Sequence, residues 1–346
     1  MTIKYGVFIG RFSPFHEGHA EIIRRSLEEV DHLLILIGSS NRARNTRNPF
    51  TFIERVEMIR ESFHWPVSQG RLSFIEVEDV PSDDRWEVEV RIHVTSQIES
   101  LSNGKAYTVF LCGHNKDASS FYTSKFPEWE QIGFQTDQYL ISATDIRERY
   151  FGKLPEIVEA YLPSGSIKFL QYFKTTADFK WLMDYYKARR EHEKAWASAP
   201  FPNKDVCADA LCVQSGHVLL VTRDKFPGKG LLALPGGHVN QFERIRDAAV
   251  RELREETKIA DRLGPIPSGR LGSYITDYKM FDDPYRSDFG RVISHTFLFR
   301  LPDSKTLWKV IGSDDASDAK WYPLADLDPT RFHDDHYHII QDMLGL

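Results

Sequence analysis

The chain has 346 residues, 41% of them hydrophobic and 27% charged, which is enough for about two globular domains, each with its own core. The net charge is -6, no long basic run occurs and the three cysteines form no C-x-x-C pair, so nucleic-acid binding, a disulfide framework and a zinc site are not expected. The first residues lack a signal-peptide pattern and the densest apolar run, Leu33–Ile37, is too short to span a membrane, so we expect a cytoplasmic protein.

Strands and helices alternate along the first half of the chain. Apolar runs rich in β-forming residues predict strands at residues 3–9, 32–37, 72–77 and 106–112. Apolar residues at helical spacing predict helices at residues 19–30, 51–63 and 87–101. This alternation predicts a doubly wound parallel sheet, in which ligands bind at the carboxyl ends of the strands.

The pattern changes after about residue 165. A polar helical stretch at residues 175–198 ends at prolines 200 and 202. Beyond it, strands are predicted at residues 206–213, 217–222, 269–276, 292–301 and 318–322, with one strong helix at about 244–257. We therefore predict an α/β protein with a doubly wound domain at residues 1–170, a linker helix at 171–203 and an α+β domain at 204–346.

The loop after the first strand has features of a phosphate site. Gly10 lets the backbone approach a phosphate closely, and the following helix offers free N–H groups at the positive end of its dipole. His16 and His19 are three residues apart at that helix end, so both imidazoles can donate to one ligand. Two surface histidines are the alternative, and the strand–loop–helix context favours the site.

A second anion site is predicted near residue 145. Ser142 or Thr144 can cap a helix that runs to about residue 150, and Arg147 falls in its first turns. A hydroxyl cap beside a guanidinium suits a polyphosphate, although an ordinary helix cap with a surface arginine is the alternative.

Together the two motifs resemble the nucleotidylyltransferase superfamily, with its (H/T)-x-G-H loop and I-S-x-T-x-x-R motif, and more closely the archaeal type of nicotinamide mononucleotide adenylyltransferase. The resemblance covers about residues 3–150 and is also carried by residues 37–39, 48–51, 54–55 and 58–59 and by Trp86. It implies transfer of AMP from ATP to nicotinamide mononucleotide, giving NAD and pyrophosphate by positioning and charge stabilisation, with Mg²⁺ helping.

The resemblance also implies roles for single residues. His16 and His19 would hold the ATP phosphates, and Arg147 would grip the triphosphate. Trp86 either stacks on the nicotinamide ring or packs in the core, and both interpretations stay open. The other residues expected to contact substrate are Gly10, Arg11, Phe12, Asn48, Ser142 and Thr144.

A third group of residues surrounds the helix of the second half. Glu252, Glu255 and Glu256 lie at i, i+3 and i+4 and so share one helix face. Three carboxylates repel one another, whereas a divalent cation such as Mg²⁺ or Mn²⁺ removes the conflict. A solvated acidic face is the alternative, and the preceding loop at residues 234–237 favours a metal site.

This region resembles the Nudix box, G-x5-E-x7-R-E-U-x-E-E-x-G-U, over about residues 204–340. Lys258 stands where the family has glycine, which puts the local turn in doubt. The resemblance implies that the three glutamates bind metal and that Arg251 and Glu243 orient them. It assigns substrate contacts to Gly236, Gly237 and Arg286, while the general base stays open among the helix glutamates, Asp282, Asp283 and Asp288.

The order of the two halves resembles bifunctional bacterial proteins in which a mononucleotide adenylyltransferase is joined to an ADP-ribose pyrophosphatase. The expected ligands are ATP, nicotinamide mononucleotide, NAD and ADP-ribose, which would be split into AMP and ribose 5-phosphate. The first half could instead use nicotinate mononucleotide or pantetheine phosphate. The second half could cleave another nucleoside diphosphate derivative or bind ADP-ribose without cleaving it, and the oligomeric state stays open.

Overall fold

The computed structural model describes residues 2–80, 82–114, 125–134, 142–152, 159–312 and 316–346. The chain forms two compact units, Met1–Met183 and Asp184–Leu346. Among the described residues, no helix is both long enough and apolar enough to cross a membrane.

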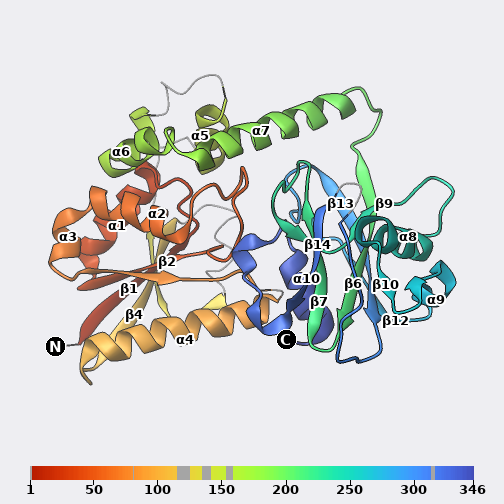
Figure 1. Ribbon diagram of the computed structural model, residues 1–346. Coiled ribbons are helices and arrows are strands. Elements are labelled where there is room, and N and C mark those ends of the chain that lie inside the picture. Colours follow the sequence, from red (N-terminus) through yellow and green to blue (C-terminus); the bar gives the residue numbers. More distant parts are fainter. Residues whose placement is uncertain (1, 81, 115–124, 135–141, 153–158, 313–315) are drawn as a thin grey trace. The chain divides into compact units, whose positions relative to one another are not determined.

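The first unit is built on a parallel sheet in the order β3-β2-β1-β4-β5 (Figure 1). Its strands are β1 (Ile3–Gly10), β2 (His32–Ile37), β3 (Leu72–Glu76), β4 (Tyr107–His114) and β5 (Glu130–Phe134). Its helices are α1 (Glu17–Glu29), α2 (Phe52–Ser62), α3 (His64–Ser68), α4 (Asp83–Ser102), α5 (Ala143–Tyr150) and α6 (Ser164–Phe173). The predicted doubly wound sheet is confirmed, and β5 and α6 are additions that the sequence patterns did not predict.

Apolar side chains cover both faces of this sheet. On one face, Val90, Val94 and Ile98 of α4 are fully buried. They pack with side chains from β1, β2 and β3 in one apolar cluster. On the other face Ile22 and Ile23 of α1 are equally buried. The parallel pairing of β1 and β2 brings the loops after them together, and Gly38 N donates to Gly10 O over 3.0 Å.

Helix α7 (Ala177–Trp196) begins in the first unit and ends in the second. In the first unit, Phe179 packs against Tyr150, Phe151 and Phe173, with ring centroids 5.5, 5.9 and 6.2 Å away. In the second unit, Tyr185 is 1% exposed and packs edge-on against rings of that unit. The helix therefore contributes buried side chains to both units, and the predicted domain limits stay a proposal.

The second unit contains a mixed sheet in the order β12-β13-β6-β7-β14, with β8 paired to β7 and β9 paired to β6. Its longer strands are β6 (Lys204–Gln214), β7 (His217–Arg223), β12 (Ile275–Phe281), β13 (Arg291–Arg300) and β14 (Ala316–Pro323). Its shorter strands are β8 (Leu232–Ala233), β9 (Gly236–His238), β10 (Ala260–Asp261) and β11 (Gly264–Pro265). Helix α8 (Ile245–Thr257) packs on one face of the mixed sheet, and α10 (His336–Leu344) packs on the other.

The strand predicted at residues 269–276 is wrong over most of its length. Residues Ser268–Gly272 form helix α9, and strand β12 begins only at Ile275. Pro267 precedes the helix with φ -61° and ψ 143°, and the amide of Leu271 closes the first turn on its carbonyl over 2.9 Å. Leu271 is fully buried although it lies on a short helix, and its apolar side chain also fits the pattern of a strand.

Candidate active sites

The two histidines of the first motif meet at the start of α1. Their rings are stacked with centroids 3.7 Å apart. The backbone N–H of His16 donates to Nδ1 of His19 over 3.4 Å, so a neutral His19 carries its proton on Nε2. Phe12 and Phe15 pack against the His19 ring at 4.9 and 6.0 Å. The aromatic packing holds the imidazole at the N-terminus of α1, where the helix dipole favours an anion.

The second motif is brought to the same loops. Ser142 caps α5, where its hydroxyl accepts from Asp145 N over 3.1 Å. Arg147 is 7% exposed and donates to the carbonyls of Ser13 and Thr46 over 2.7 and 3.0 Å. Its third contact is Oγ1 of Thr144, 3.0 Å away. Ile141 of the motif lies outside the described residues. The guanidinium thus binds the loops that carry the site.

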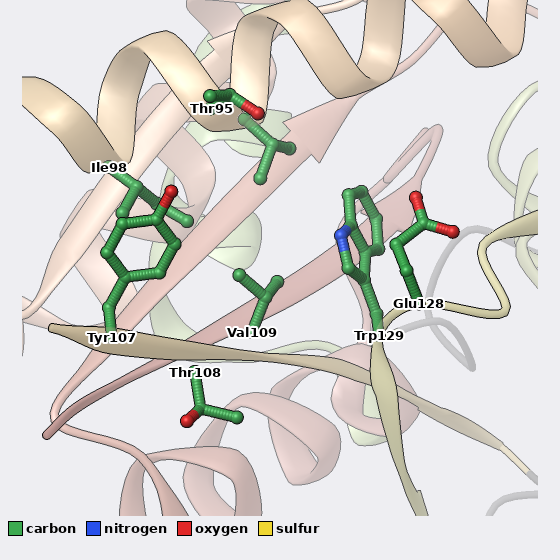
Figure 2. Close-up of a pocket in the computed structure, with 8 residues that line it drawn as sticks. Thr95, Ile98, Tyr107, Thr108, Val109, Glu128 and Trp129 are labelled. Atoms are coloured by element: carbon green, nitrogen blue, oxygen red, sulfur yellow. The ribbon is translucent and has the colours of Figure 1, made fainter.

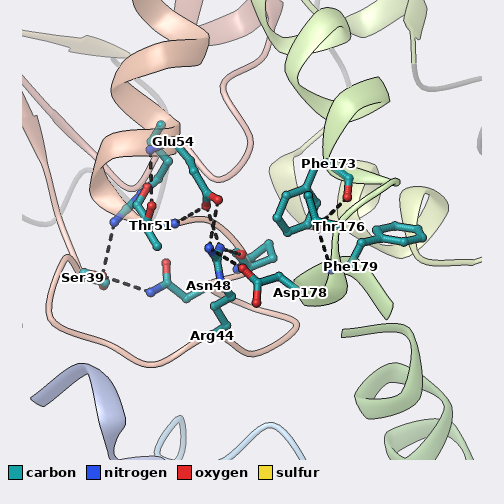
Figure 3. A network of polar contacts seen from close by, with 11 residues as sticks. Ser39, Arg44, Asn48, Thr51, Glu54, Phe173, Thr176, Asp178 and Phe179 are labelled. Atoms are coloured by element: carbon teal, nitrogen blue, oxygen red, sulfur yellow. Dashed lines mark hydrogen bonds and ion pairs between the residues drawn. The ribbon is translucent and has the colours of Figure 1, made fainter. Parts of the chain in front are cut away.

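The loop after β2 continues into a network around Arg44 (Figure 3). Nη1 and Nη2 of Arg44 bind the carboxylate of Glu54 over 2.6 and 2.9 Å, and Nη2 also meets Asp178 of α7 at 3.0 Å. Within this loop Asn48 is 6% exposed and donates to Ser39 O over 3.0 Å. Oδ1 of Asn48 is buried with no hydrogen-bond partner in the described part of the chain.

The remaining predicted contacts of the first unit lie on β1 and α4. Gly10 leaves little room for a side chain, because an added Cβ would approach the ring of Phe12 to 3.0 Å. Arg11 is exposed, whereas Phe12 is 1% exposed. Trp86 is half-buried on α4, with its ring 6.0 Å from that of Phe126. That contact is compatible with both interpretations of Trp86.

A cavity of about 330 Å³ lies elsewhere in this unit, between α4 and β4 (Figure 2). Tyr107, the first residue of β4, and Trp129, just before β5, both line it. The cavity is therefore at the amino ends of these strands, whereas the histidine loop follows the carboxyl end of β1. None of the residues predicted to contact substrate lines it.

In the second unit Arg251 organises the acidic face of α8. Its Nε and Nη2 bind the carboxylate of Glu243 over 2.8 and 2.9 Å. Its Nη1 donates to Glu252 over 2.6 Å and to Glu255 over 3.1 Å. The hydrogen bonds from Arg251 lower the pKa of Glu243. Arg251 thus binds Glu243 and two of the helix carboxylates, and the orienting role that the Nudix resemblance implies stays a prediction.

The other side of the acidic face meets the glycines of β9. Gly236 N donates to Oε2 of Glu256 over 3.0 Å, and an added Cβ on Gly237 would lie 2.5 Å from Oε1 of Glu252. Burial raises the pKa of Glu256 to about 8 and also raises that of Glu252. Glu256 is 8% exposed and forms no ion pair with any described residue. A buried carboxylate without a cation is a chemically suitable ligand for a divalent ion.

No group of three or more His, Cys, Asp or Glu side chains in the described ranges is arranged to hold a metal ion. Glu252 and Glu255 instead form ion pairs with Arg251. The oxygen donors of the three glutamates fit Mg²⁺ or Mn²⁺ by their chemistry, and the metal-ligand assignment stays a proposal.

Lys258, in the position of the missing box glycine, adopts the left-handed conformation that glycine favours. It caps α8 in the left-handed region, with φ 44° and ψ 35°, and its N–H closes on Arg254 O over 3.0 Å. A left-handed non-glycine residue costs about 1–2 kcal/mol, so the helix end is strained but retained.

Two polar groups near β9 extend this site. Arg286 has a side chain only 5% exposed and binds both carboxylate oxygens of Asp335, over 2.7 and 3.0 Å. Asp209 of β6 is 5% exposed and accepts a short hydrogen bond from Ser294. An added Cβ on Gly236 would lie 2.0 Å from Oδ1 of Asp209. The sequence interpretation did not include Asp209, although a carboxylate inside the apolar run at residues 206–213 was the available signal.

Comparisons with known proteins agree with the two kinds of domain expected from the sequence. Residues 7–149 match the Cytidylyltransferase-like family and residues 204–343 match the NUDIX domain. The Nicotinamide/nicotinic acid mononucleotide adenylyltransferase of Acinetobacter baylyi is 39% identical over 186 residues, which are 54% of this chain and 94% of the relative. The Nicotinamide-nucleotide adenylyltransferase of Thermococcus onnurineus is 28% identical, over 52% of this chain and 88% of its own.

Two solved structures of one enzyme match over 99% of the chain. The bifunctional NMN adenylyltransferase/ADP ribose pyrophosphatase from Francisella tularensis, complexed with AMP and a manganese ion, is 32% identical, with a TM-score of 0.88 and 99% of both chains covered. A parallel sheet with paired histidines, followed by a Nudix helix, defines a nucleotidylyltransferase joined to a Nudix hydrolase. The chain belongs to the family of bifunctional NMN adenylyltransferase/ADP ribose pyrophosphatases.

Proposed function

We propose that the first unit makes NAD from ATP and nicotinamide mononucleotide, and that the second hydrolyses ADP-ribose to AMP and ribose 5-phosphate. The observation that carries this conclusion is the match to the Francisella enzyme over 99% of the chain, with both motif sets present on the shared backbone. Each activity follows from groups that belong to one unit alone.

In the transferase, a phosphate oxygen of the mononucleotide attacks the α-phosphorus of ATP and pyrophosphate leaves. The protein forms no covalent bond, so its contribution is positioning and stabilisation of phosphate charge. We assign Nε2–H of His19 and the N-terminus of α1 to the ATP phosphates, because the contact with His16 N makes Nδ1 the acceptor and Nε2 the donor of a neutral His19. Arg147 keeps the surrounding loops in place through the carbonyls of Ser13 and Thr46.

In the hydrolase, we assign Glu252, Glu255 and Glu256 to a divalent cation, Mg²⁺ or Mn²⁺, which polarises the diphosphate and activates water when bound. Arg251 holds Glu252 and Glu255 before the metal arrives and stays anchored by Glu243. The glycines of β9 let the carboxylates of Asp209 and Glu252 approach the backbone, because an added Cβ would lie 2.0 Å from Oδ1 of Asp209 and 2.5 Å from Oε1 of Glu252.

Product chromatography tests both activities. With Mg²⁺ and ATP plus nicotinamide mononucleotide we expect NAD and pyrophosphate, and with ADP-ribose we expect AMP and ribose 5-phosphate. Binding of ADP-ribose without turnover would contradict the hydrolase. Nicotinate mononucleotide belongs in the same assay, because the name of the Acinetobacter relative includes the nicotinic acid form.

Trp86→Ala is expected to raise the KM for the mononucleotide more than the KM for ATP. A stacked base is worth roughly 1–3 kcal/mol, which corresponds to a roughly 5–150-fold change in binding. Steady-state kinetics with each substrate varied in turn measures the difference. An equal loss for both substrates, or loss of folding, would assign Trp86 to packing beside Phe126 instead.

The two activities are expected to be separable into fragments. The sequence predicts that residues 1–170 keep the transferase and that a fragment from about 200 keeps the hydrolase. Packing favours fragments divided after residue 183 instead. The 1–170 fragment lacks the buried Phe173, and the fragment that begins at about 200 lacks the buried Tyr185. Losing a buried aromatic side chain costs about 3–5 kcal/mol. Assays and melting curves of both fragment pairs check this, and folded but inactive fragments would contradict independent domains.

A further inference from the structure

Arg55 of α2 is a fully buried arginine, with 0% of its surface exposed. It forms no ion pair with any described residue, and its hydrogen bonds go to backbone carbonyls. Nη1 donates to Arg11 O over 2.9 Å and to Gly38 O over 2.7 Å. Nε donates to Thr51 O over 3.2 Å, and Nη2 to Ser39 O over 3.4 Å. Burial lowers the pKa of Arg55 to about 10, so the group remains charged at neutral pH.

The two carbonyls bound by Nη1 occupy equivalent places in two loops. Arg11 precedes Phe12, which has φ 49°, and Gly38 precedes Ser39, which has φ 52°. Each loop directly follows a central strand, β1 or β2. A left-handed conformation costs a non-glycine residue about 1–2 kcal/mol, so both loops need an outside group to hold them.

The same two peptides carry N–H groups without a partner. In a trans peptide the C=O and the N–H point in opposite directions, so binding of the Arg11 and Gly38 carbonyls turns the N–H groups of Phe12 and Ser39 away from Arg55. Neither N–H has an acceptor among the described residues. Backbone N–H groups next to left-handed residues form concave sites that bind anions.

We propose that Arg55 is a positioning residue for nucleotidyl transfer, which clamps the loops after β1 and β2 so that the Phe12 and Ser39 N–H groups face the phosphates of the nucleotide substrates. This inference rests on the proposed transferase function. A planar guanidinium with five donors can bind four carbonyls at once, whereas an ammonium at this depth cannot span them. Arg55 therefore acts through the loops and does not itself touch substrate.

Arg55→Lys tests the clamp, with Arg60→Lys as the matched control, because Arg60 is on the same helix and exposed. We expect kcat/KM for NAD synthesis to fall roughly 10²-fold, the effect of about a 1 Å misplacement at a reacting centre, with a loss in kcat as well as in KM. Arg60→Lys should stay within about twofold, and ADP-ribose hydrolysis should be unchanged in both variants. A folded Arg55→Lys with normal transferase kinetics would overturn the inference.

Two substitutions at Ser39 keep the test decisive if Arg55→Lys does not fold. Ser39→Gly and Ser39→Ala lose the same hydroxyl, which binds Asp79 over 3.0 Å, but only glycine takes a positive φ without strain. The alanine variant should have a kcat/KM roughly 5–30-fold below that of the glycine variant, as a strain of about 1–2 kcal/mol predicts. Equal rates for the two would overturn the inference. A wild-type chain unable to form NAD would overturn the proposed function and the inference together.

Discussion

His19→Ala is expected to lower NAD synthesis by roughly 10²–10³-fold, the usual loss when one oriented donor to a charged transition state is removed. The reason is the tautomer: His16 N donates to Nδ1 of His19, so Nε2 of a neutral His19 carries the proton that we assign to the phosphates. The effect should appear in kcat, because the charge on the phosphates grows in the transition state.

Three further measurements define the role of His19. ADP-ribose hydrolysis should be unchanged in the same preparation. His64→Ala, at a histidine whose side chain is 74% exposed, should leave NAD synthesis normal. His19→Gln can place an amide N–H near the position of Nε2 and should retain more activity than alanine. Near-normal turnover of His19→Ala would assign the stacked histidine pair to packing of the loop.

The parts of the fold that the sequence predicted are those with strong local patterns. Strand β2 is an unbroken apolar run, and α8 repeats apolar residues at helical spacing, so both were placed within one or two residues. Strand β5, Glu130–Phe134, has only two apolar side chains and stays in place by pairing with β4. Local periodicity carries no information about such a pairing, and β5 was therefore missed.

Site residues that are close together in the sequence were predicted, whereas contacts between distant parts of the chain were not. His16 and His19, or Glu252 and Glu256, lie within four positions of each other, so spacing alone placed them together. Arg55 binds a carbonyl 44 positions away, and no local pattern reveals that contact. The available signal was a charged residue on the same helix face as Met58 and Ile59, both fully buried. Arg147 binds a carbonyl 101 positions away, a contact that the sequence motif could not show.

Glu256→Gln should lower ADP-ribose turnover by roughly two or more orders of magnitude, because the metal would lose a hard anionic ligand while the side-chain shape is kept. The amide oxygen of glutamine can still accept from Gly236 N, so the backbone of β9 should not move. Excess Mg²⁺ or Mn²⁺ should restore part of the activity. Asp247→Asn, at an exposed carboxylate in the first turn of the same helix, serves as the control and should retain full turnover.

Although Glu256→Gln should lower turnover, it should raise the thermal stability of the metal-free protein. Burial raises the pKa of Glu256 from 4.5 to about 8. Between pH 4.5 and about pH 8, Glu256 is therefore protonated in the folded protein and ionised in the unfolded chain. Glu256 therefore destabilises the fold increasingly as pH rises from about 4.5 to about 8. The glutamine variant should melt at a higher temperature than wild type in chelator at pH 8, and at nearly the same temperature near pH 4.5. A stabilised variant with lost turnover supports a metal ligand, whereas full turnover would remove Glu256 from the mechanism.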